Sequence, residues 1–472
     1  MWNAHHRWQE LVAGRARRVM VIGLDCVPPH FAFEQYRAEM PNLHGLMARG
    51  TYGPMHSTVP PITVPAWSAM FSGRDPGELG LYGFQQPRPG VQYGRRLVSP
   101  ADVQQPRVWH WLGEQGKRVA VLFVPPSYPP EPVNGVQVSC FMTPDAQSSY
   151  TYPPELQREL EQRFGAYLMD VEDVRSAEYT RLLQELHRMT EQHFAIAEHV
   201  WRTQQPDFMA MVAIGPDRFH HAFYEHMDPR HPRYAADGPL AGAGGEFYRL
   251  LDLQLGRLLA CASSDTACVV VSDHGARPLL GGIAINEWLL RMGWLRLHRY
   301  PTTVTSFSQA DVDWSRTVAY GEGGYCGRVR LNLKGREPEG IVPPGEQQAW
   351  VRRIAAALAE MRGPSGEPLS QRLVEPSAYR EQRGQPPELQ VFFDDLAYRA
   401  IASLGHGQVH VAGDERGPDG CNHAWHGIFV AAGAGISPRG AIDHCTVYDV
   451  ARTVSGLMGV TPPAGLLGED RR

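Results

Sequence analysis

The feature that most constrains this chain is a set of three short apolar runs, each followed within three residues by an aspartate. The runs cover residues 19–24, 208–214 and 268–271, and the aspartates are Asp25, Asp217 and Asp273. Continuous apolar runs of this length are typical of parallel strands that are buried on both faces. Ligands bind beyond the carboxyl ends of such strands, so the pattern predicts a polar site at one edge of a sheet.

Helical patterns lie between the apolar runs, with apolar residues at three-to-four spacing over residues 179–201 and 246–260. This alternation predicts an α/β fold with a mostly parallel central sheet flanked by helices. Between residues 281 and 404 the chain changes to turns rich in Pro and Gly and to short alternating strands. We therefore expect a core of residues 18–280 and 405–465, an inserted smaller α+β lobe of residues 281–404, and an N-terminal extension of residues 1–17.

Composition excludes several classes of partner. The 45 basic and 50 acidic residues give a net charge of −5, and no basic block is present, so we expect no nucleic-acid polymer as a partner. No stretch of about 20 apolar residues occurs, so no membrane span is expected. The seven cysteines are odd in number and contain no Cys-x-x-Cys pair, which favours free thiols and a cytoplasmic location.

The strand-end aspartates have histidines close by in the sequence. Asp217 and His221 are four positions apart and would share one face of a helix, while Asp273 and His274 are adjacent. An aspartate at a strand end is often only a helix N-cap, but three carboxylates at one sheet edge repel each other unless cations neutralise them. Mixed Asp/His ligation suits Zn²⁺ or Mn²⁺ better than Mg²⁺ or Ca²⁺. Five or six ligands exceed one tetrahedral zinc and predict two metals, roughly 3.5–4 Å apart.

Thr63 is the candidate nucleophile. It lies just before an expected helix start, with Pro65 in the first turn. The N–H groups and dipole of a helix N-terminus favour an anion such as a phosphate, and a threonine oxygen can attack phosphorus there. The alternative is that Thr63 only caps the helix. Other hydroxyl groups nearby belong to Ser57, Thr58 and Ser68.

Taken in order, these motifs resemble a known family. They are residues 23–25 (Gly-Leu-Asp), residues 63–67 (Thr-Val-Pro-Ala-Trp), Asp217 with His221, residues 273–275 (Asp-His-Gly) and a late histidine before an apolar strand. This set resembles the alkaline phosphatase superfamily, in the branch of type I phosphodiesterases/nucleotide pyrophosphatases and their bacterial phosphohydrolase and phosphomutase relatives. The similarity runs from about residue 18 to 460 and includes residues 285–293 and 332–342.

The resemblance implies an alkaline-phosphatase-like fold and two metal sites. One site would be built from Asp217, His221 and His423. The other would be built from Asp25, Asp273 and His274, with Thr63 as the nucleophile at that metal. His423 is preferred because it precedes the apolar strand at residues 427–432 by four positions. The other histidines in this part of the chain are His406, His410, His426 and His444.

Two departures from related enzymes affect the substrate. Many nucleotide pyrophosphatases carry an Asn shortly after the nucleophile, whereas this chain reads Pro65-Ala66-Trp67. Phosphate contacts are therefore expected from Arg218 or from the inserted lobe. In that lobe Lys334 and Arg336 are candidates for the remote part of the substrate, and Tyr320 and Tyr325 could stack on a base or sugar. The chain also lacks the Cys/Ser-x-Pro-x-Arg motif of sulfatases, which argues against sulfatase activity.

The sequence thus predicts a two-metal phosphoric ester hydrolase of phosphodiesterase or nucleotide pyrophosphatase type. Thr63 would form a covalent phospho- or nucleotidyl-enzyme, one metal would activate Thr63, and the other would stabilise the leaving oxygen and later supply hydroxide. Zn²⁺ is the expected metal, with Mn²⁺ as the alternative, and the substrate is a small phosphate ester or nucleotide. The alternatives are a phosphomonoesterase, a phosphotransferase or mutase acting on a small phosphorylated metabolite, and a non-catalytic metal-binding protein.

Overall fold

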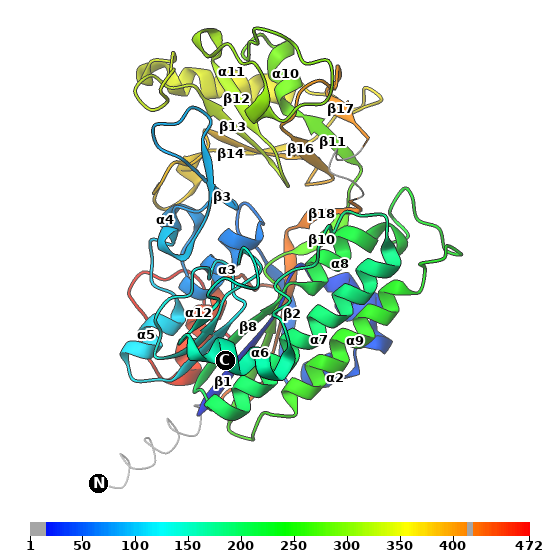
Figure 1. Ribbon diagram of the computed structural model, residues 1–472, viewed down its shortest axis with the longest axis vertical. Coiled ribbons are helices and arrows are strands. Elements are labelled where there is room, and N and C mark those ends of the chain that lie inside the picture. The colour runs from blue at the N-terminus through cyan, green and yellow to red at the C-terminus, as the bar shows by residue number, and fades with distance from the viewer. Residues whose placement is uncertain (1–15, 413–418) are drawn as a thin grey trace.

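A computed structural model describes residues 16–412 and 419–472 and shows a large core beneath a smaller lobe (Figure 1). Most of the predicted N-terminal extension, residues 1–15, lies outside the described residues. The core contains a nine-stranded sheet of order β20-β2-β19-β9-β1-β8-β5-β6-β7. Its strands are β1 (Arg18–Leu24), β2 (Thr51–His56), β5 (Val119–Leu122), β6 (Gly135–Val138), β7 (Thr151–Tyr152), β8 (Phe208–Ala213), β9 (Thr266–Val271), β19 (His426–Gly433) and β20 (Gly440–Ala441).

The centre of this sheet is parallel, as predicted. β1 lies between β8 and β9 and pairs in parallel with both, whereas β19 joins β9 and β2 in antiparallel fashion. Successive side chains of β1 enter different cores: Met20 and Ile22 pack on one face of the sheet, and Val19 and Val21 on the other. This burial on both faces explains why the strand sequence is apolar throughout rather than alternating.

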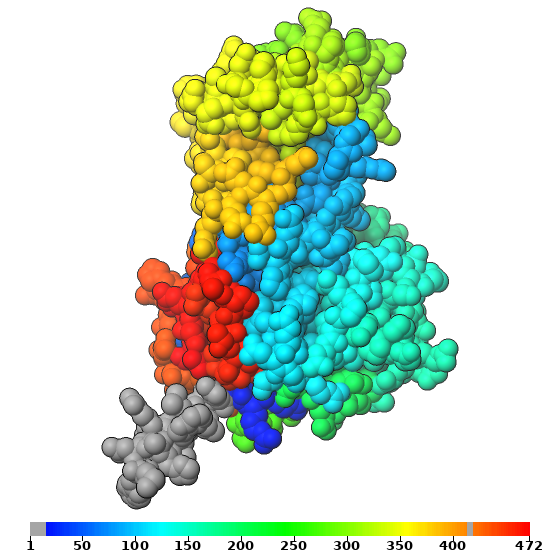
Figure 2. Space-filling view, turned by 90° about the vertical axis from the view of Figure 1, so that its left-hand side faces the viewer, coloured from blue at the N-terminus to red at the C-terminus, as the bar shows by residue number. Residues whose placement is uncertain are grey.

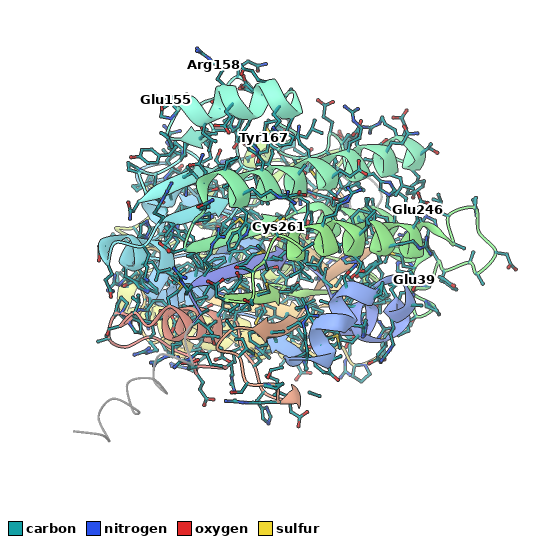
Figure 3. All side chains as sticks on the ribbon, turned by 90° about the horizontal axis from the view of Figure 1, so that it is seen from below. Glu39, Glu155, Arg158, Tyr167, Glu246 and Cys261 are labelled. Carbon is teal, nitrogen blue, oxygen red and sulfur yellow. The ribbon has the colours of Figure 1, made fainter. Side chains whose placement is uncertain are left out.

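Helices cover both faces of the core sheet. One face carries α2 (Pro41–Ala48), α6 (Glu155–Phe164), α7 (Tyr179–Gln204), α8 (Gly215–Phe223) and α9 (Ala243–Leu259). The other carries α3 (Thr63–Ser72), α4 (Pro76–Leu79), α5 (Val108–Glu114) and α12 (Asp449–Met458). Figure 3 shows α6, with Glu155 and Arg158, on the outside of the first layer, and α9 begins near the labelled Glu246. No helix within the described ranges is long and apolar enough to cross a membrane.

The lobe is built on a second, seven-stranded sheet. Its strands are β11 (Gly281–Ala284), β12 (Ala319–Glu322), β13 (Gly327–Leu331), β14 (Gln371–Val374), β15 (Leu389–Phe393), β16 (Tyr398–Ile401) and β17 (His410–Val411), and its helices are α10 (Ile285–Arg291) and α11 (Gln347–Ala359). The short strand β17 continues this sheet past residue 404, because it pairs with β11.

Two ribbons connect the lobe with the core. β10 (Gly275–Pro278) pairs with β18 (Cys421–Ala424) where the chain enters and leaves the lobe. The hairpin of β3 (Gln85–Pro87) and β4 (Arg95–Leu97) rises from the core beside the lobe, in blue in Figures 1 and 2. At its tip the ring of Tyr93 packs against Phe307 and Tyr320 of the lobe, with centroids 4.6 Å and 5.6 Å away. Residues 379–383 of the lobe also bond to the core, through Tyr379 to the Val59 carbonyl and Arg380 to Asp75, so the lobe is fixed to the core at several places.

Gly23 in β1 gives a stability prediction. A Cβ at this position would lie 2.4 Å from the ring of Trp67 and 2.9 Å from the Met211 carbonyl oxygen. We expect Gly23→Ala to lower the free energy of unfolding by about 1–3 kcal/mol, because it overpacks a closed core. In the matched control Gly45→Ala, on α2, the new methyl group meets nothing within 4 Å. Helix propensity should then raise stability by about 0.5–1 kcal/mol. Urea unfolding of both variants checks the prediction, and equal stabilities would contradict it.

Candidate functional site

The site lies where three neighbouring core strands end. Asp25 directly follows β1, Asp217 lies in the first turn of α8 directly beyond β8, and Asp273 follows β9 by two residues. Because β1 pairs in parallel with both β8 and β9, the three carboxylates meet at one sheet edge. All three side chains are buried. The structure therefore gathers the aspartates as the apolar runs predict.

One group contains Asp217, His221 and His423. The helix α8 places Asp217 and His221 one turn apart, with His221 Nε2 3.5 Å from Asp217 Oδ1. His423, on β18, brings its Nε2 to 3.6 Å from the same oxygen. These three residues offer ligand atoms close enough together to hold a metal ion.

The second group contains Asp25, Asp273 and His274. His274 Nε2 lies 3.2 Å from Asp273 Oδ2 and 3.8 Å from Asp25 Oδ1, and the three residues could also hold a metal ion. The rings of His274 and His423 stack with their centroids 3.7 Å apart, so the two groups adjoin. This is the arrangement that a pair of metal ions requires.

The hydrogen bonds of the three histidines fit metal binding. Nδ1 of His423 contacts the Pro61 carbonyl at 2.8 Å, and Nδ1 of His274 contacts the Gly275 carbonyl at 3.2 Å. Nδ1 of His221 contacts Asp419 Oδ1 at 2.8 Å. These partners are acceptors, so each Nδ1 donates a hydrogen bond and each Nε2 lies toward the carboxylates. Metal-binding histidines are typically oriented in this way by their second nitrogen.

Several buried ligand atoms have no hydrogen-bond partner among the residues that the structure describes. They are Asp25 Oδ1, Asp217 Oδ1, Asp273 Oδ2, His221 Nε2 and His423 Nε2. A buried polar atom without a partner is costly, and here five such atoms converge on the two groups. Divalent cations would satisfy all of them at once, so the residues present fit a pair of metal ions.

The pKa shifts of the three aspartates also favour bound cations at the site. Burial, followed by the nearby Asp217 carboxylate, raises the pKa of Asp25 well above its usual range. Burial and then Asp25 raise the pKa of Asp273. Burial alone would also raise the pKa of Asp217, but His221 and His423 lower it well below its usual range. Burial and mutual repulsion thus disfavour the charged forms of Asp25 and Asp273, and a bound cation would favour them.

Thr63 lies at the edge of the second group. It is the first residue of α3, so the helix begins at Thr63 rather than after it, and Ile62 is the N-cap residue. The Thr63 hydroxyl makes no capping bond and lies 3.3 Å from His274 Nε2. The N–H groups of Thr63 and Val64 are at the helix N-terminus, where no intrahelical acceptor exists. The same short segment therefore presents a hydroxyl and two N–H donors to one place.

The other hydroxyl groups near Thr63 are placed differently. Thr58 donates its hydroxyl proton to the Pro60 carbonyl at 2.6 Å. The hydroxyls of Ser57 and Ser68 are buried without a hydrogen-bond partner. Ser68 lies further along α3, in its interior. Of these four hydroxyl groups, that of Thr63 is hydrogen-bonded to His274, which belongs to the second candidate metal-binding group.

Two residues that were not among the predicted site residues form hydrogen bonds to the candidate metal ligands. Asp419 fixes His221 and also accepts from Arg175 at 2.8 Å and from Arg399, on β16, at 2.6 Å. Trp67 donates its indole N–H to Asp25 Oδ2 at 2.7 Å. Trp67 belongs to the motif at residues 63–67, so its position one helical turn after Thr63 was a usable signal. Asp419 had no local signal, because its partner lies 198 residues earlier.

Tyr325 closes the site on the side of the lobe. Its ring stacks on His423 with the centroids 3.5 Å apart and the planes inclined by 21°. Asn422 holds the segment by donating to the Tyr325 carbonyl at 3.0 Å. Tyr325 and Ile62, the neighbour of Thr63, both line a cleft of about 310 Å³. The metal-binding groups therefore adjoin a cleft between core and lobe.

Of the remaining candidates from the sequence, Arg218 contacts the site, whereas Lys334 and Arg336 lie in the lobe. Arg218 is held by both oxygens of Asp170, at 2.9 Å and 2.8 Å, and by Asp217 at 2.7 Å. In the lobe Arg336 pairs with Glu388 and Glu337, and Lys334 is exposed after β13. Of the other late histidines, His426 packs edge-on against His56, His410 lies on β17, His444 is exposed, and His406 bonds to Ser403.

Comparison with known proteins identifies relatives of this architecture. A family model described as type I phosphodiesterase / nucleotide pyrophosphatase matches residues 19–428. No curated protein matches the chain. Human ectonucleotide pyrophosphatase / phosphodiesterase 5 is 11% identical, with a TM-score of 0.54 over 94% of this chain and 96% of that one.

Two further solved structures share the fold. Phosphonoacetate hydrolase from Sinorhizobium meliloti 1021, in complex with phosphonoacetate, is 15% identical, with a TM-score of 0.57 over 93% of this chain and 95% of that one. An inactive form of the murine ectonucleotide pyrophosphatase / phosphodiesterase 5, in complex with AMP, is 11% identical, with a TM-score of 0.53 over 95% and 96%. At these identities the likeness concerns the fold.

Proposed function

Because the chain belongs to the type I phosphodiesterase / nucleotide pyrophosphatase family, which comprises hydrolases of phosphoric esters, we propose that it uses two divalent metal ions and Thr63 as its nucleophile. Asp217, His221 and His423 would hold one ion. Asp25, Asp273 and His274 would hold the other, with Thr63 Oγ1 as a further ligand. The observation that carries this proposal is the convergence of five partnerless buried ligand atoms beside the Thr63 hydroxyl.

The reaction would proceed in two displacements at phosphorus. Thr63 Oγ1 forms a bond to phosphorus as its proton passes to water, and the bond from phosphorus to the leaving oxygen breaks. Water then attacks the phospho-threonine, which releases the product and restores the hydroxyl. The N–H groups of Thr63 and Val64 would hold the phosphate oxygens. When bound, the ions supply positive charge that lowers the pKa of the Thr63 hydroxyl and stabilises the leaving oxygen.

Supporting roles follow from the hydrogen bonds. Trp67 would hold the Asp25 carboxylate, and Asp419 would hold the His221 ring, so that both ligands keep their orientation. Arg218 lies against Asp217 and would act mainly by positioning that carboxylate, since Asp170 engages two of its nitrogen atoms. Lys334 and Arg336 remain predictions for contacts with the remote part of a larger substrate.

The substrate would be a small phosphodiester or pyrophosphate, and the metal Zn²⁺, with Mn²⁺ as the alternative because their ligand preferences overlap. A cytoplasmic location remains a prediction that the seven free thiols support. Metal analysis of the purified protein, combined with a panel of mono- and diesters that includes nucleotide conjugates and sugar phosphates, tests the proposal. Two equivalents of metal and turnover of diesters are expected, and a protein that binds no metal would refute it.

A phosphotransferase or mutase is the second candidate, since Tyr325 and the lobe partly enclose the site. Turnover in ¹⁸O-labelled water separates the two. A hydrolase incorporates ¹⁸O into the phosphate product, whereas a mutase returns the phosphoryl group to a second substrate hydroxyl and leaves the phosphate unlabelled.

The role of Asp419 gives a prediction. Asp419→Asn should weaken metal binding about 10- to 100-fold, because the amide can no longer serve as a charged acceptor for His221 Nδ1 and for two arginines. Competition with a chromogenic chelator measures the metal affinity. Activity should return at high metal concentration. The control Asp443→Asn, at an exposed position, should bind metal as the unaltered protein does. Unchanged metal affinity in Asp419→Asn would remove this role.

A further inference from the structure

Two neighbouring cleft sections lie beside the candidate metal-binding groups, from which Tyr325 separates them by stacking on His423. The inner section, of about 310 Å³, is lined by Ile62, Tyr325 and Arg175, and the outer section, of about 520 Å³, by Tyr93 and Arg95. Gln85, Gly323, Gly324, Arg328 and Arg399 line both sections, so the two lie side by side. The cleft therefore has room for the part of an ester that extends away from the reacting phosphorus.

The outer section borders a cluster in which arginines outnumber carboxylates: Arg95, Arg328 and Glu322 line the section, and Arg330 belongs to the cluster but not to the lining. Glu322 at the end of β12 is the shared partner of three guanidinium groups, those of Arg95, Arg328 and Arg330. Burial alone would raise the pKa of Glu322, but the three arginines lower it to about 2. One carboxylate thus neutralises one of three charges. The Arg328 Nε and Arg330 Nη1 atoms are buried without a hydrogen-bond partner among the described residues.

Arg328 connects the two sections. It lines both, and its two terminal nitrogens donate to the carbonyls of Tyr82 and Gly323 at 3.3 Å and 3.0 Å, while Nε lies 3.4 Å from Glu322. These contacts fix the guanidinium at the cleft wall, where it shares the Glu322 carboxylate with Arg95 and Arg330. Deeper in the cleft, Arg399 lies beside the Tyr325 ring, 5.8 Å from its centroid. Arg175 and Arg399, which also line the inner section, both pair with the Asp419 carboxylate.

We propose that this cleft binds a second anionic group of the substrate, a carboxylate or a phosphate, on the part of the ester that stays outside the metal site. The inference rests on the proposed function, because it assumes that the reacting phosphate sits at the metal-binding groups. Guanidinium groups bind carboxylate and phosphate through short charge-assisted hydrogen bonds. An uncharged group such as a nucleoside would leave the excess positive charge of the arginine cluster unpaired.

Four p-nitrophenyl phosphodiesters test this assignment with the zinc-loaded protein. They differ in the second alcohol, which is methyl, 2-carboxyethyl, 2-phosphonooxyethyl or 5′-thymidyl. We expect kcat/KM to be about tenfold or more higher for at least one doubly anionic ester than for the methyl ester. The better of the carboxylate and phosphate arms identifies the group. A thymidyl or methyl ester that equals or exceeds both charged esters overturns the proposal.

Arg328→Met should lower kcat/KM for the charged esters to about that for the methyl ester, and Arg328→Lys should restore part of the preference. The control is Arg352→Met. Arg352 is exposed on α11 and is not one of the residues that line the two cleft sections, so this variant should keep the preference. A preference that survives Arg328→Met overturns the assignment.

Binding separates this inference from the proposed function. Calorimetry measures the affinities of the intact esters for a Thr63→Ala protein, with and without Arg328→Met. The ratio of the affinities for the charged esters and the methyl ester reports the preference for a charged group without turnover. If the protein hydrolyses no ester but binds the charged esters about tenfold more tightly through Arg328, the anion site stands and the proposed hydrolysis fails. If it hydrolyses the methyl ester and binds all four esters equally, the hydrolysis stands and the anion site fails.

Discussion

Thr63→Ala should lower kcat for phosphodiester hydrolysis by at least about a thousandfold, because the variant lacks the oxygen that attacks phosphorus. The hydroxyl makes no capping bond and its removal leaves α3 with the same Ile62 N-cap, so the fold should persist. Steady-state kinetics with a chromogenic diester, metal analysis and a thermal melt of the same preparation measure activity, metal content and stability together.

Two variants make this result specific to the Thr63 oxygen. Thr63→Ser keeps a hydroxyl at the same backbone position and should recover a measurable part of the activity. Ser68→Ala removes a buried hydroxyl from the same helix and should change kcat less than twofold. Acid quenching during turnover should also trap a phosphoryl adduct, seen as added mass on the peptide that contains Thr63. Full activity in Thr63→Ala, or an adduct on another residue, would exclude Thr63 as the nucleophile.

His423→Gln should remove one equivalent of metal and lower kcat/KM by at least about a hundredfold, because the ion beside Asp217 would lose its third protein ligand. His423 Nε2 lies 3.6 Å from Asp217 Oδ1, and its Nδ1 is anchored by the Pro61 carbonyl at 2.8 Å. Metal content by atomic emission and the metal concentration needed for half-maximal activity are the two measurements.

His426→Gln is the matched control, since it changes the same residue type three positions along the chain. His426 belongs to β19 and contacts His56 rather than the carboxylates, so metal content and activity should stay within twofold of the unaltered protein. If His426→Gln lost the metal and His423→Gln kept it, the assignment of the late ligand would be wrong. The pair therefore also decides between two of the late histidines that the sequence left open, His423 and His426.

The sequence was sufficient for those parts of the fold that depend on local patterns. The apolar runs at residues 208–214 and 268–271 became β8 (Phe208–Ala213) and β9 (Thr266–Val271), and the pattern at residues 179–201 became α7 (Tyr179–Gln204). Each of these elements is specified by the burial of its own side chains, which repeats at the period of a strand or helix. The structure starts α3 one residue earlier than predicted, because Ile62 rather than Thr63 is the N-cap residue.

The sequence by itself determined the central strands, the aspartates at their ends and the spacing of Asp217 and His221, because the carboxyl ends of parallel strands must meet at one edge. Only the tertiary structure showed that Asp419 supports His221 and that Glu322 is surrounded by Arg95, Arg328 and Arg330. These contacts join segments up to 227 residues apart. They depend on how the lobe and the β3–β4 hairpin rest on the core, and no local periodicity encodes that packing.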